Sequence, residues 1–372
     1  MSRKIFMLVS TLSVLLALIV VGIGSPTASF AQSATAAATA AGPVATAKPG
    51  QNISFTLLPK AIGNPVFNDT DKGAQEAAAE LKSGGKYQYV GPDKADIQQQ
   101  IEFIKSLTTQ GVNVIAISAN DADAVVPALK DAMAKNIKVV GWDSPPAADG
   151  RNVFIEQVDF DTAGKVMADM ALDILGANGG KFAVLSATAD APNQNAWIAS
   201  LKDTLKQDKY SKLQLVDTVY GNDDADKSYT EAQGLIDKHP DLQLIMAPTT
   251  VGIAAAAKAM QDGKMCDKVK VSGLGFPSDM VAYVHNGCAP EFALWSFKDI
   301  GYLTYYTGYM LATGAIKGAE GESFHAGRMG DYTIQKDKNG GLFILMGPFS
   351  QWNKDNIDAA VGAPAATMAA TP

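Results

Sequence analysis

Cysteine and histidine are scarce in this chain, which has two cysteines and three histidines among 372 residues. The three histidines do not combine with the cysteines into a metal-binding pattern, which argues against a structural zinc site. The chain also lacks a G-x-S-x-G nucleophile elbow and a phosphate-binding P-loop. The sequence therefore predicts a binding protein with no cofactor, and it argues against an enzyme and against ATP hydrolysis by this chain.

Clusters of basic residues are missing as well. The chain has 31 Lys and Arg against 38 Asp and Glu, a formal net charge of −7. Nucleic acids and anionic membrane surfaces attract concentrated positive charge, and nothing in this sequence supplies it. We therefore expect no nucleic acid partner and no binding to a charged membrane surface.

A calcium loop is only weakly suggested by the acidic run at residues 221–226. Counted from Asn222, Lys227 stands where a calcium loop needs glycine, and Gln233 stands where it needs a bidentate acid. We interpret this run as a solvated loop that caps the helix following it.

Long apolar runs are absent except at the start, where residues 5–23 follow Arg3 and Lys4. The small–x–small pattern Ser29-Phe30-Ala31 then predicts a signal peptide over residues 1–31, cleaved near Gln32. The alternative is an uncleaved anchor, because the run approaches the length of a membrane span. Either reading predicts export to the periplasm or to the outer face of the cytoplasmic membrane. No cysteine lies near the cleavage site, which excludes a lipoprotein anchor.

Residues 32–51 and 359–372 are rich in alanine, threonine and proline and show no periodicity. We interpret the first segment as a flexible linker and the second as a flexible tail. Export also places the two cysteines in an oxidising compartment. Cys266 precedes a predicted strand and Cys288 follows the helix after it, so both should reach the same end of a lobe. We predict a disulfide between them; two buried free thiols are the alternative.

Strands and helices alternate along most of the chain, which predicts an α/β fold with parallel sheets. The pattern restarts after residue 150, so we expect two similar doubly wound lobes with a cleft between them. The predicted strands of the first half lie at residues 53–58, 87–90, 112–117 and 137–142. Those of the second half lie at residues 153–155, 181–185, 213–219, 244–246, 269–274 and 291–294, with a β-rich remainder at 329–346.

The stretch Val139-Val140-Gly141-Trp142-Asp143 ends a predicted buried strand with a carboxylate, and two prolines follow within three residues. Ligands of open α/β sheets bind at the carboxyl ends of the strands. Asp143 is therefore the strongest candidate for a ligand anchor, beside a segment in which the prolines restrict the backbone.

Other polar and aromatic side chains also follow predicted strands. Amides and carboxylates bind pairs of hydroxyl groups, and aromatic faces cover the C–H patch of a sugar ring, so this mixture predicts a small neutral sugar as ligand. The candidate ligand-binding residues are Lys60, Asn64, Phe67, Asp143, Asn193, Gln194, Asn195, Thr249, Trp295 and Asp299.

Several candidates have a purely structural alternative. Asn64 before a proline could shape a turn, and Phe67 could be a packing residue beside a helix start. Lys60 could be a solvated loop charge, Trp295 a core residue, and Asn193 a helix N-cap. For Asp121, we favour the interpretation that it caps the following helix.

The chain resembles the type I solute-binding proteins of ABC sugar importers over residues 53–356. Asn64-Pro65-Val66-Phe67 followed by Lys72-Gly73-Ala74 is similar to the opening of the ribose-binding branch. Trp142-Asp143-Ser144, Asn193-Gln194-Asn195 and Ala247-Pro248-Thr249-Thr250 are similar to the rhamnose-binding proteins and to their relatives that bind autoinducer-2.

The autoinducer-2 binders resemble this chain at Lys60, Asp143 and Gln194, but they have aspartate at the position of Asn193 and Asp-Ala at that of Thr249-Thr250. The resemblance therefore favours rhamnose, with autoinducer-2 signalling as the alternative.

The resemblance further implies a monomer that closes on its ligand and docks on a membrane permease. We expect hinges near residues 144–148, 274–277 and 325–329. The first lobe would then comprise residues 52–144 and 277–325, and the second 145–276 and 326–358.

Overall fold

The computed structural model describes residues 43–362. The predicted signal peptide, residues 32–42 of the linker and residues 363–372 of the tail lie outside the described residues. Between residues 43 and 362, no helix is both long enough and apolar enough to cross a membrane.

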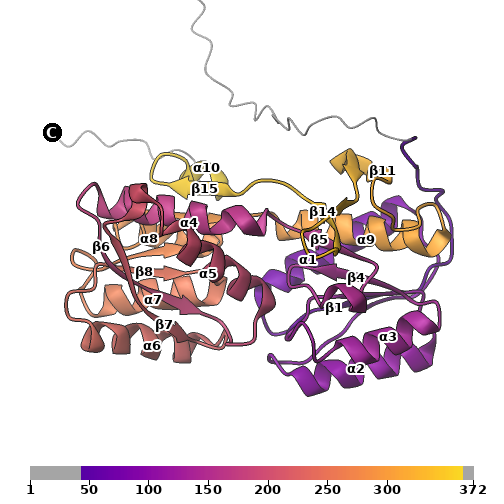
Figure 1. The fold of residues 1–372 in the computed structure, drawn as a ribbon, viewed down its shortest axis with the longest axis horizontal. Helices are drawn as coiled ribbons and strands as arrows, with labels where there is room; N and C mark the ends of the chain where they lie inside the picture. The colour runs from indigo at the N-terminus through magenta and orange to yellow at the C-terminus, as the bar shows by residue number, and fades with distance from the viewer. Residues whose placement is uncertain (1–42, 363–372) are drawn as a thin grey trace, which may run out of the picture. The chain divides into compact units, whose positions relative to one another are not determined.

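Seven strands form the larger sheet, in the order β13-β14-β5-β4-β3-β1-β2. Strands β14, β5, β4 and β1 of this sheet are labelled in Figure 1. All neighbours are parallel except β13 and β14, which are antiparallel. We call this sheet and the helices on its two faces the first lobe. Its strands are β1 (Phe55–Leu58), β2 (Tyr87–Tyr89), β3 (Val114–Ile117), β4 (Lys138–Trp142), β5 (Val153–Glu156), β13 (Gln335–Lys336) and β14 (Leu342–Leu345).

Helices α1 (Pro65–Glu80) and α9 (Phe297–Thr313) pack together on one face of this sheet. Two glycines allow their close approach: a Cβ on Gly73 would lie 1.8 Å from the Lys298 carbonyl oxygen, and one on Gly301 would lie 1.8 Å from that of Thr70. Helices α2 (Ile97–Gln110) and α3 (Val126–Ala134) contribute to a separate apolar cluster with the sheet. The first sheet is thus covered on both faces, as parallel sheets require.

A four-stranded parallel sheet in the order β7-β6-β8-β9 forms the centre of the second lobe. Helices α4 and α5 pack together, and α6 and α7 do so in another cluster with the sheet. The strands are β6 (Gly180–Ser186), β7 (Leu213–Tyr220), β8 (Leu244–Ala247) and β9 (Lys270–Gly273). The helices are α4 (Phe160–Leu175), α5 (Pro192–Thr204), α6 (Ala225–Lys238), α7 (Thr250–Asp262) and α8 (Pro277–His285).

Three short elements complete the second lobe. Strands β10 (Glu291–Leu294) and β15 (Ser350–Asn353) form an antiparallel pair, and β10 is joined to the lobe through a bridge between Leu274 and Ala293. Helix α10 (Ile357–Ala360) buries Ile357 in the same cluster as α8. The predicted α/β class is confirmed, although the two sheets differ in their number of strands.

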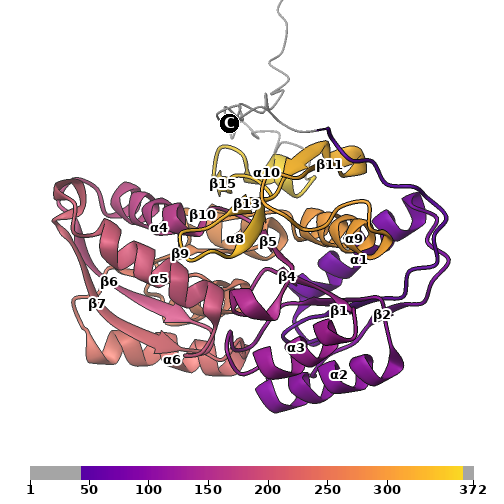
Figure 2. The same ribbon diagram turned by 45° about the vertical axis from the view of Figure 1, so that its right-hand side comes forward.

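Within residues 43–362, the chain passes between the lobes at residues 157–159, 295–296 and 346–349. We call these segments the three crossovers. The hinges expected near residues 144–148, 274–277 and 325–329 were therefore misplaced. Strand β5 pairs with β4 and continues the first sheet instead of opening the second (Figure 2). The connection from β4 to β5 contains one short 3-10 helix (Ala148–Gly150) in place of a full helix, which made it resemble a lobe boundary in the sequence.

The predicted lobe boundaries change for the same reason. Residues 277–294 were expected in the first lobe, but Met280 and Val284 of α8 and Phe292 of β10 are buried in the second. Residues 326–345 were expected in the second lobe, but β14 lies beside β5 in the first sheet. Nearby, β11 (Ser323–His325) and β12 (Asp331–Thr333) form a separate antiparallel pair.

Part of the predicted linker and of the predicted tail is ordered structure. Ala45 forms a bridge with Phe324, and the Tyr309 hydroxyl donates to the Lys48 carbonyl oxygen at 2.7 Å. Residues 43–51 therefore pack on the first lobe, and the prediction of a flexible linker was wrong for them. Ala359 and Ala360 likewise belong to α10 instead of a flexible tail.

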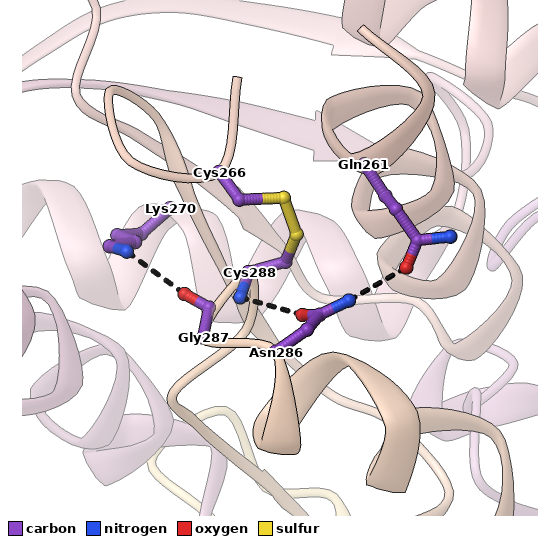
Figure 3. Close-up of a disulfide and its surroundings, with 6 residues drawn as sticks. All are labelled: Gln261, Cys266, Lys270, Asn286, Gly287 and Cys288. Carbon is purple, nitrogen blue, oxygen red and sulfur yellow. Dashed lines mark hydrogen bonds between the residues drawn. A yellow bond between two sulfur atoms is a disulfide. The ribbon is translucent and has the colours of Figure 1, made fainter. Parts of the chain in front are cut away.

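Cys266 and Cys288 form a disulfide, with their Cα atoms 4.5 Å apart (Figure 3). Side-chain bonds surround the bridge: Asn286 Oδ1 accepts from the Cys288 N–H at 3.0 Å, and Asn286 Nδ2 donates to Gln261 Oε1 at 2.6 Å. The disulfide joins the loop before β9 to the turn after α8, at the end of the second sheet where β9 begins.

Candidate functional site

A cleft with about 390 Å³ of empty space, partly open to solvent, is lined by both lobes and by the second crossover. Most of its lining follows the carboxyl ends of strands, where a parallel α/β sheet binds its ligands. The residues that line the cleft are Lys60, Asn64, Val66, Phe67 and Asp143 of the first lobe; Asn193, Gln194, Trp197, Asp223, Pro248, Thr249, Thr250, Leu274 and Leu294 of the second; and Trp295 and Phe297.

Asp143 follows β4 directly and is 4% exposed. Its φ of +57° lies in the left-handed region, and the Ser144 N–H donates to the Trp142 carbonyl oxygen at 2.6 Å, which closes a tight turn around Asp143. Residues other than glycine are uncommon in this conformation and cluster at functional sites. The turn directs the carboxylate to Ser118, whose hydroxyl donates to Oδ2 at 2.8 Å.

Asn193 connects the two lobes across the cleft. Its Nδ2 donates to Asp143 Oδ1 at 3.2 Å, and its Oδ1 accepts from Lys60 Nζ at 2.9 Å. Asn193 lies in the first turn of α5, which begins at Pro192 in the position where proline is best tolerated. The Asn193 amide thus bonds both Lys60 and Asp143, the two charged groups that the first lobe contributes to the cleft.

Two further polar groups of the second lobe line the cleft. Gln194 Oε1 accepts from the Ser186 hydroxyl and from the Ala187 N–H, each at 2.7 Å. The Thr249 hydroxyl, at the N-cap of α7, donates to Asp223 Oδ1. Asp223 has a φ of +51°, so a second carboxylate enters the cleft from a turn in the left-handed region.

Burial governs the ionisation of the charged groups in the cleft. It lowers the pKa of the Lys60 ammonium, while the carboxylates of Asp143 and Asp223 oppose this shift. It raises the pKa of Asp143, opposed by Lys60 and by the Ser118 hydroxyl, and it raises that of Asp223, opposed by the Thr249 hydroxyl. With all three groups ionised, the cleft carries one net negative charge.

Aromatic rings form the apolar part of the lining. Phe67 packs edge-on against Trp142 with ring centroids 5.5 Å apart, and Trp295 packs against Trp197 at 5.4 Å. Phe67 is 4% exposed and so serves both the core and the cleft. Among the described residues, the buried indole nitrogens of Trp197 and Trp295 have no hydrogen-bond acceptor. Both residues line the cleft, but these two nitrogen atoms are themselves buried.

Eight of the ten predicted ligand-binding residues line the cleft: Lys60, Asn64, Phe67, Asp143, Asn193, Gln194, Thr249 and Trp295. Asn64 also caps α1 by accepting from the Val66 N–H at 3.2 Å, so the structural alternative holds for it as well. Asp121 was expected to cap the following helix, but it caps only the turn before α3, by accepting from the Asp123 and Ala124 N–H groups; α3 itself begins at Val126 without a side-chain cap.

Asn195 and Asp299 do not line the cleft. Asn195 is exposed on α5 and donates to the Ala189 carbonyl oxygen at 2.7 Å, because the helix turns this position away from its neighbours Asn193 and Gln194. Asp299 lies in the first turn of α9 and pairs with Arg328 at 2.7 Å. Helical geometry reverses the side-chain direction within two residues, so sequence proximity to the cleft did not suffice.

Asp223 was missed because the acidic run around it was interpreted as a solvated loop. That interpretation is right for its neighbour: Asp224 caps α6 by accepting from the Lys227 N–H at 3.0 Å. Asp223 directly precedes that cap, after the end of β7, so the rule that selected Asp143 could have found it. Trp197 was missed too; it lies one helical turn after Asn193 on the same face of α5.

Comparison with known proteins identifies the family. The periplasmic binding protein domain matches residues 55–316 of this chain. The chain belongs to this family. It is 43% identical to a sugar ABC transporter protein of Actinomyces odontolyticus, with a TM-score of 0.67 over 83% of this chain and 99% of that one.

Two other solved structures carry ligands. An ABC transporter solute-binding protein of Clostridium phytofermentas with bound L-rhamnose is 35% identical, with a TM-score of 0.79 over 86% of this chain and 99% of that one. LsrB of Clostridium saccharobutylicum in complex with AI-2 is 25% identical, with a TM-score of 0.77 over 82% of this chain and 99% of that one. The protein is thus a sugar-binding component of an ABC transporter, a non-enzymatic receptor for its solute.

Proposed function

We propose that this protein binds a neutral deoxy sugar, with L-rhamnose as the first candidate, and delivers it to the permease of an ABC importer. The observation that carries the proposal is the buried Asp143 carboxylate, which faces Lys60 and Asn193 in an aromatic-lined cleft. A carboxylate accepts hydrogen bonds from adjacent hydroxyl groups, and the rings cover the C–H surface of a sugar.

The charge of the cleft supports a neutral ligand. With all three groups ionised, Asp143 and Asp223 outnumber Lys60, so a sugar acid or a sugar phosphate would add negative charge to a negative site. The apolar side chains of Val66, Leu274 and Leu294 line the same cleft, and they suit the methyl group of a 6-deoxy sugar. The likeness to the rhamnose-bound protein of Clostridium phytofermentas supports this choice.

Autoinducer-2 is the second candidate, in which case the protein would serve a signalling or uptake route for that molecule. Lys60 and Gln194 match the lysine and glutamine expected of autoinducer-2 binders, and both line the cleft. The likeness to LsrB favours the same reading. Asn193 and Thr249-Thr250 depart from that pattern, which is why rhamnose comes first.

A thermal-shift panel tests both candidates. The chain from residue 32 is purified and heated with L-rhamnose, other deoxy sugars, pentoses, ribose, autoinducer-2, galacturonate and rhamnose 1-phosphate. A ligand that binds only the folded state raises the midpoint, and at equal concentration a tighter ligand raises it more. We expect the largest rise with L-rhamnose and none with the two anionic sugars. A rise with autoinducer-2 alone would transfer the protein to the second candidate, and a rise with an anionic sugar would contradict the charge argument.

We further propose that the protein acts as a monomer outside the cytoplasmic membrane, and that its lobes close on the ligand by bending at the three crossovers. A ligand that contacts both lobes favours the closed form through its differential affinity. Light scattering of the purified chain should give the mass of one copy. Small-angle scattering with and without ligand should show a more compact liganded form.

A further inference from the structure

Gln157 is buried in the first crossover, where the chain leaves the first lobe after β5 and enters the second at α4. It is 0% exposed, and it does not line the cleft. Glutamine is seldom buried completely, because both ends of its amide then need partners. The contacts of this side chain therefore call for an explanation beyond packing.

The amide of Gln157 is directed at Asp143. Its Nε2 donates to the Asp143 backbone carbonyl oxygen at 3.0 Å and lies 3.4 Å from Asp143 Oδ1. These two acceptors fix the orientation of the amide, because the opposite orientation would place its oxygen against both of them. In this orientation the Oε1 atom has no donor among the described residues. The Gln157 amide thus donates to Asp143 through Nε2, while its buried Oε1 stays unpaired.

Asp143 needs such a donor because its backbone conformation is unfavourable. A φ of +57° in a non-glycine residue costs free energy that the surrounding structure must offset. The turn around Asp143 is closed by a single bond between Ser144 and Trp142, and the two prolines after it lack N–H groups. Gln157 supplies the bond to the carbonyl oxygen of the turn, from a segment outside it.

We propose that Gln157 is a positioning residue for sugar binding, which holds the Asp143 turn in its binding geometry and ties that geometry to the first crossover. Gln157 acts through Asp143 and not on the ligand. Bending at the first crossover then changes the bond between Gln157 and the Asp143 turn. Ligand affinity therefore depends on the conformation of the crossover as well as on the residues that line the cleft. This inference rests on the proposed function, because it assigns Asp143 as the sugar anchor.

The deciding variant is Gln157→Glu, which keeps the shape of the side chain and makes its donor depend on pH. A protonated carboxyl can donate to the Asp143 carbonyl oxygen, whereas an ionised one cannot and adds a negative charge beside Asp143. We expect near wild-type affinity at pH 5 and a loss of at least about tenfold relative to wild type by pH 8. Lys60, Asp223 and Glu156 also titrate near this region, so the variant is compared with wild type at each pH.

A second variant, Gln157→Met, removes the donor at every pH with little change of volume. We expect its affinity to be about tenfold below wild type, with no pH trend of its own relative to wild type.

The matched control for Gln157→Glu is Gln88→Glu, which makes the same glutamine-to-glutamate change at a half-buried position of β2, away from the cleft. Binding is measured by calorimetry with the panel sugar that gives wild type the largest thermal shift.

The outcomes separate a positioning role from a structural one. Wild-type affinity of both Gln157 variants at every pH would overturn the inference, as would a lower thermal midpoint with unchanged affinity. If Gln157→Glu does not fold at pH 8, Gln157→Met decides alone.

A readout without ligand is the carboxyl pKa of Asp143, followed by ¹³C NMR in the unliganded protein. It should rise in Gln157→Met, since a donor near Oδ1 is lost, and an unchanged value would overturn the inference. If wild type binds no sugar of the panel, the proposed function fails, while this measurement still decides the role of Gln157.

Discussion

Asp143 Oδ1 and Asn193 Nδ2 lie 3.2 Å apart, although the two residues come from different lobes and are 50 positions apart in the chain. Both groups are buried, and the same Asn193 amide accepts from Lys60. The polar groups that would engage a sugar are therefore bonded to one another across the cleft. A ligand that enters must exchange these bonds for its own, which favours sugars whose hydroxyl groups replace both donors and acceptors.

Asp143→Ala should lower sugar affinity at least about 100-fold, because it removes the acceptor of two or more hydrogen bonds to a charged group. We also expect a lower thermal midpoint for the unliganded variant, because Lys60 is left buried without the carboxylate that stabilises its charge. The control is Asp121→Ala, which removes another aspartate that follows a strand. Asp121 only caps a turn, so this control should keep full affinity; equal losses in the two variants, measured by calorimetry, would contradict the anchor role of Asp143.

Asp223→Asn should weaken sugar binding by about tenfold, because the carboxylate bonded to Thr249 loses its charge within the cleft. The matched control is Asp224→Asn, one residue later. Asp224 caps α6, and asparagine is nearly as good a cap, so we expect little loss of stability and none of affinity. Titration calorimetry on both variants separates the site from the cap. Unchanged affinity in Asp223→Asn would mean that Asp223 has no role in sugar binding and is only part of a solvated loop.

Phe67→Ala should lower both sugar affinity and stability, because the ring fills the core against Trp142 and also lines the cleft. The expected loss of unfolding free energy is about 3–5 kcal/mol. Phe67→Leu keeps most of the apolar volume but removes the aromatic face, so it should retain most of the stability and still bind sugar more weakly. Urea unfolding and calorimetry on the pair test this; normal affinity in Phe67→Leu would reduce Phe67 to a packing residue.

Glu156, which directly precedes the first crossover, should make the stability of the protein depend on pH. Burial raises its pKa to about 7, opposed by the Phe160 N–H, which donates to Oε1 at 2.9 Å. A carboxyl whose folded pKa lies above its unfolded value contributes stability that is complete below about pH 4.5 and is lost as pH rises through about 7. Glu156→Gln should remove this dependence.

The measurement is the thermal midpoint of wild type and of Glu156→Gln between pH 4.5 and 8. Their difference isolates Glu156 from the other titrating groups, and the wild type should lose on the order of 1–3 kcal/mol relative to the variant over this range. Parallel curves would show that Glu156 titrates normally.

The disulfide should protect both cysteines from thiol reagents. Labelling of the denatured, unreduced protein should find no free thiol, and two reactive thiols would contradict the bridge between Cys266 and Cys288. Reduction should lower the free energy of unfolding by about 3 kcal/mol, because the bridge closes a loop of about 20 residues in the unfolded chain. A Cys266→Ala/Cys288→Ala double variant, unfolded in urea, should match the reduced protein.

Much of the fold could be predicted because local patterns determine strands and helices. Strand β10 was expected over its full span, and Asn64, Asp96 and Ser296 begin helices in the usual way by accepting backbone hydrogen bonds. The sheet to which each strand belongs could not be predicted in this way. Strand β5 is a short buried apolar run, and such a run fits either sheet equally well.

Several site residues could also be predicted from local sequence patterns. Asp143, Lys60 and Thr249 follow buried strands, and the carboxyl ends of parallel strands face the cleft. Asp223 follows the same rule, but it stands in a run of acids whose next member, Asp224, is a helix cap. Periodicity cannot tell which of two adjacent carboxylates turns inward, because that depends on the left-handed conformation of Asn222 and Asp223.

The sequence by itself determined the α/β class, the candidate anchor Asp143 and the resemblance to a sugar receptor, because each rests on a short pattern of residues. The tertiary structure decided which strands share a sheet, where the crossovers lie and which side chains meet across the cleft. These depend on pairing between distant segments, such as β14 with β5 and Asn193 with Asp143. The free energy of such pairing comes from burial and hydrogen bonds that exist only once the chain has folded.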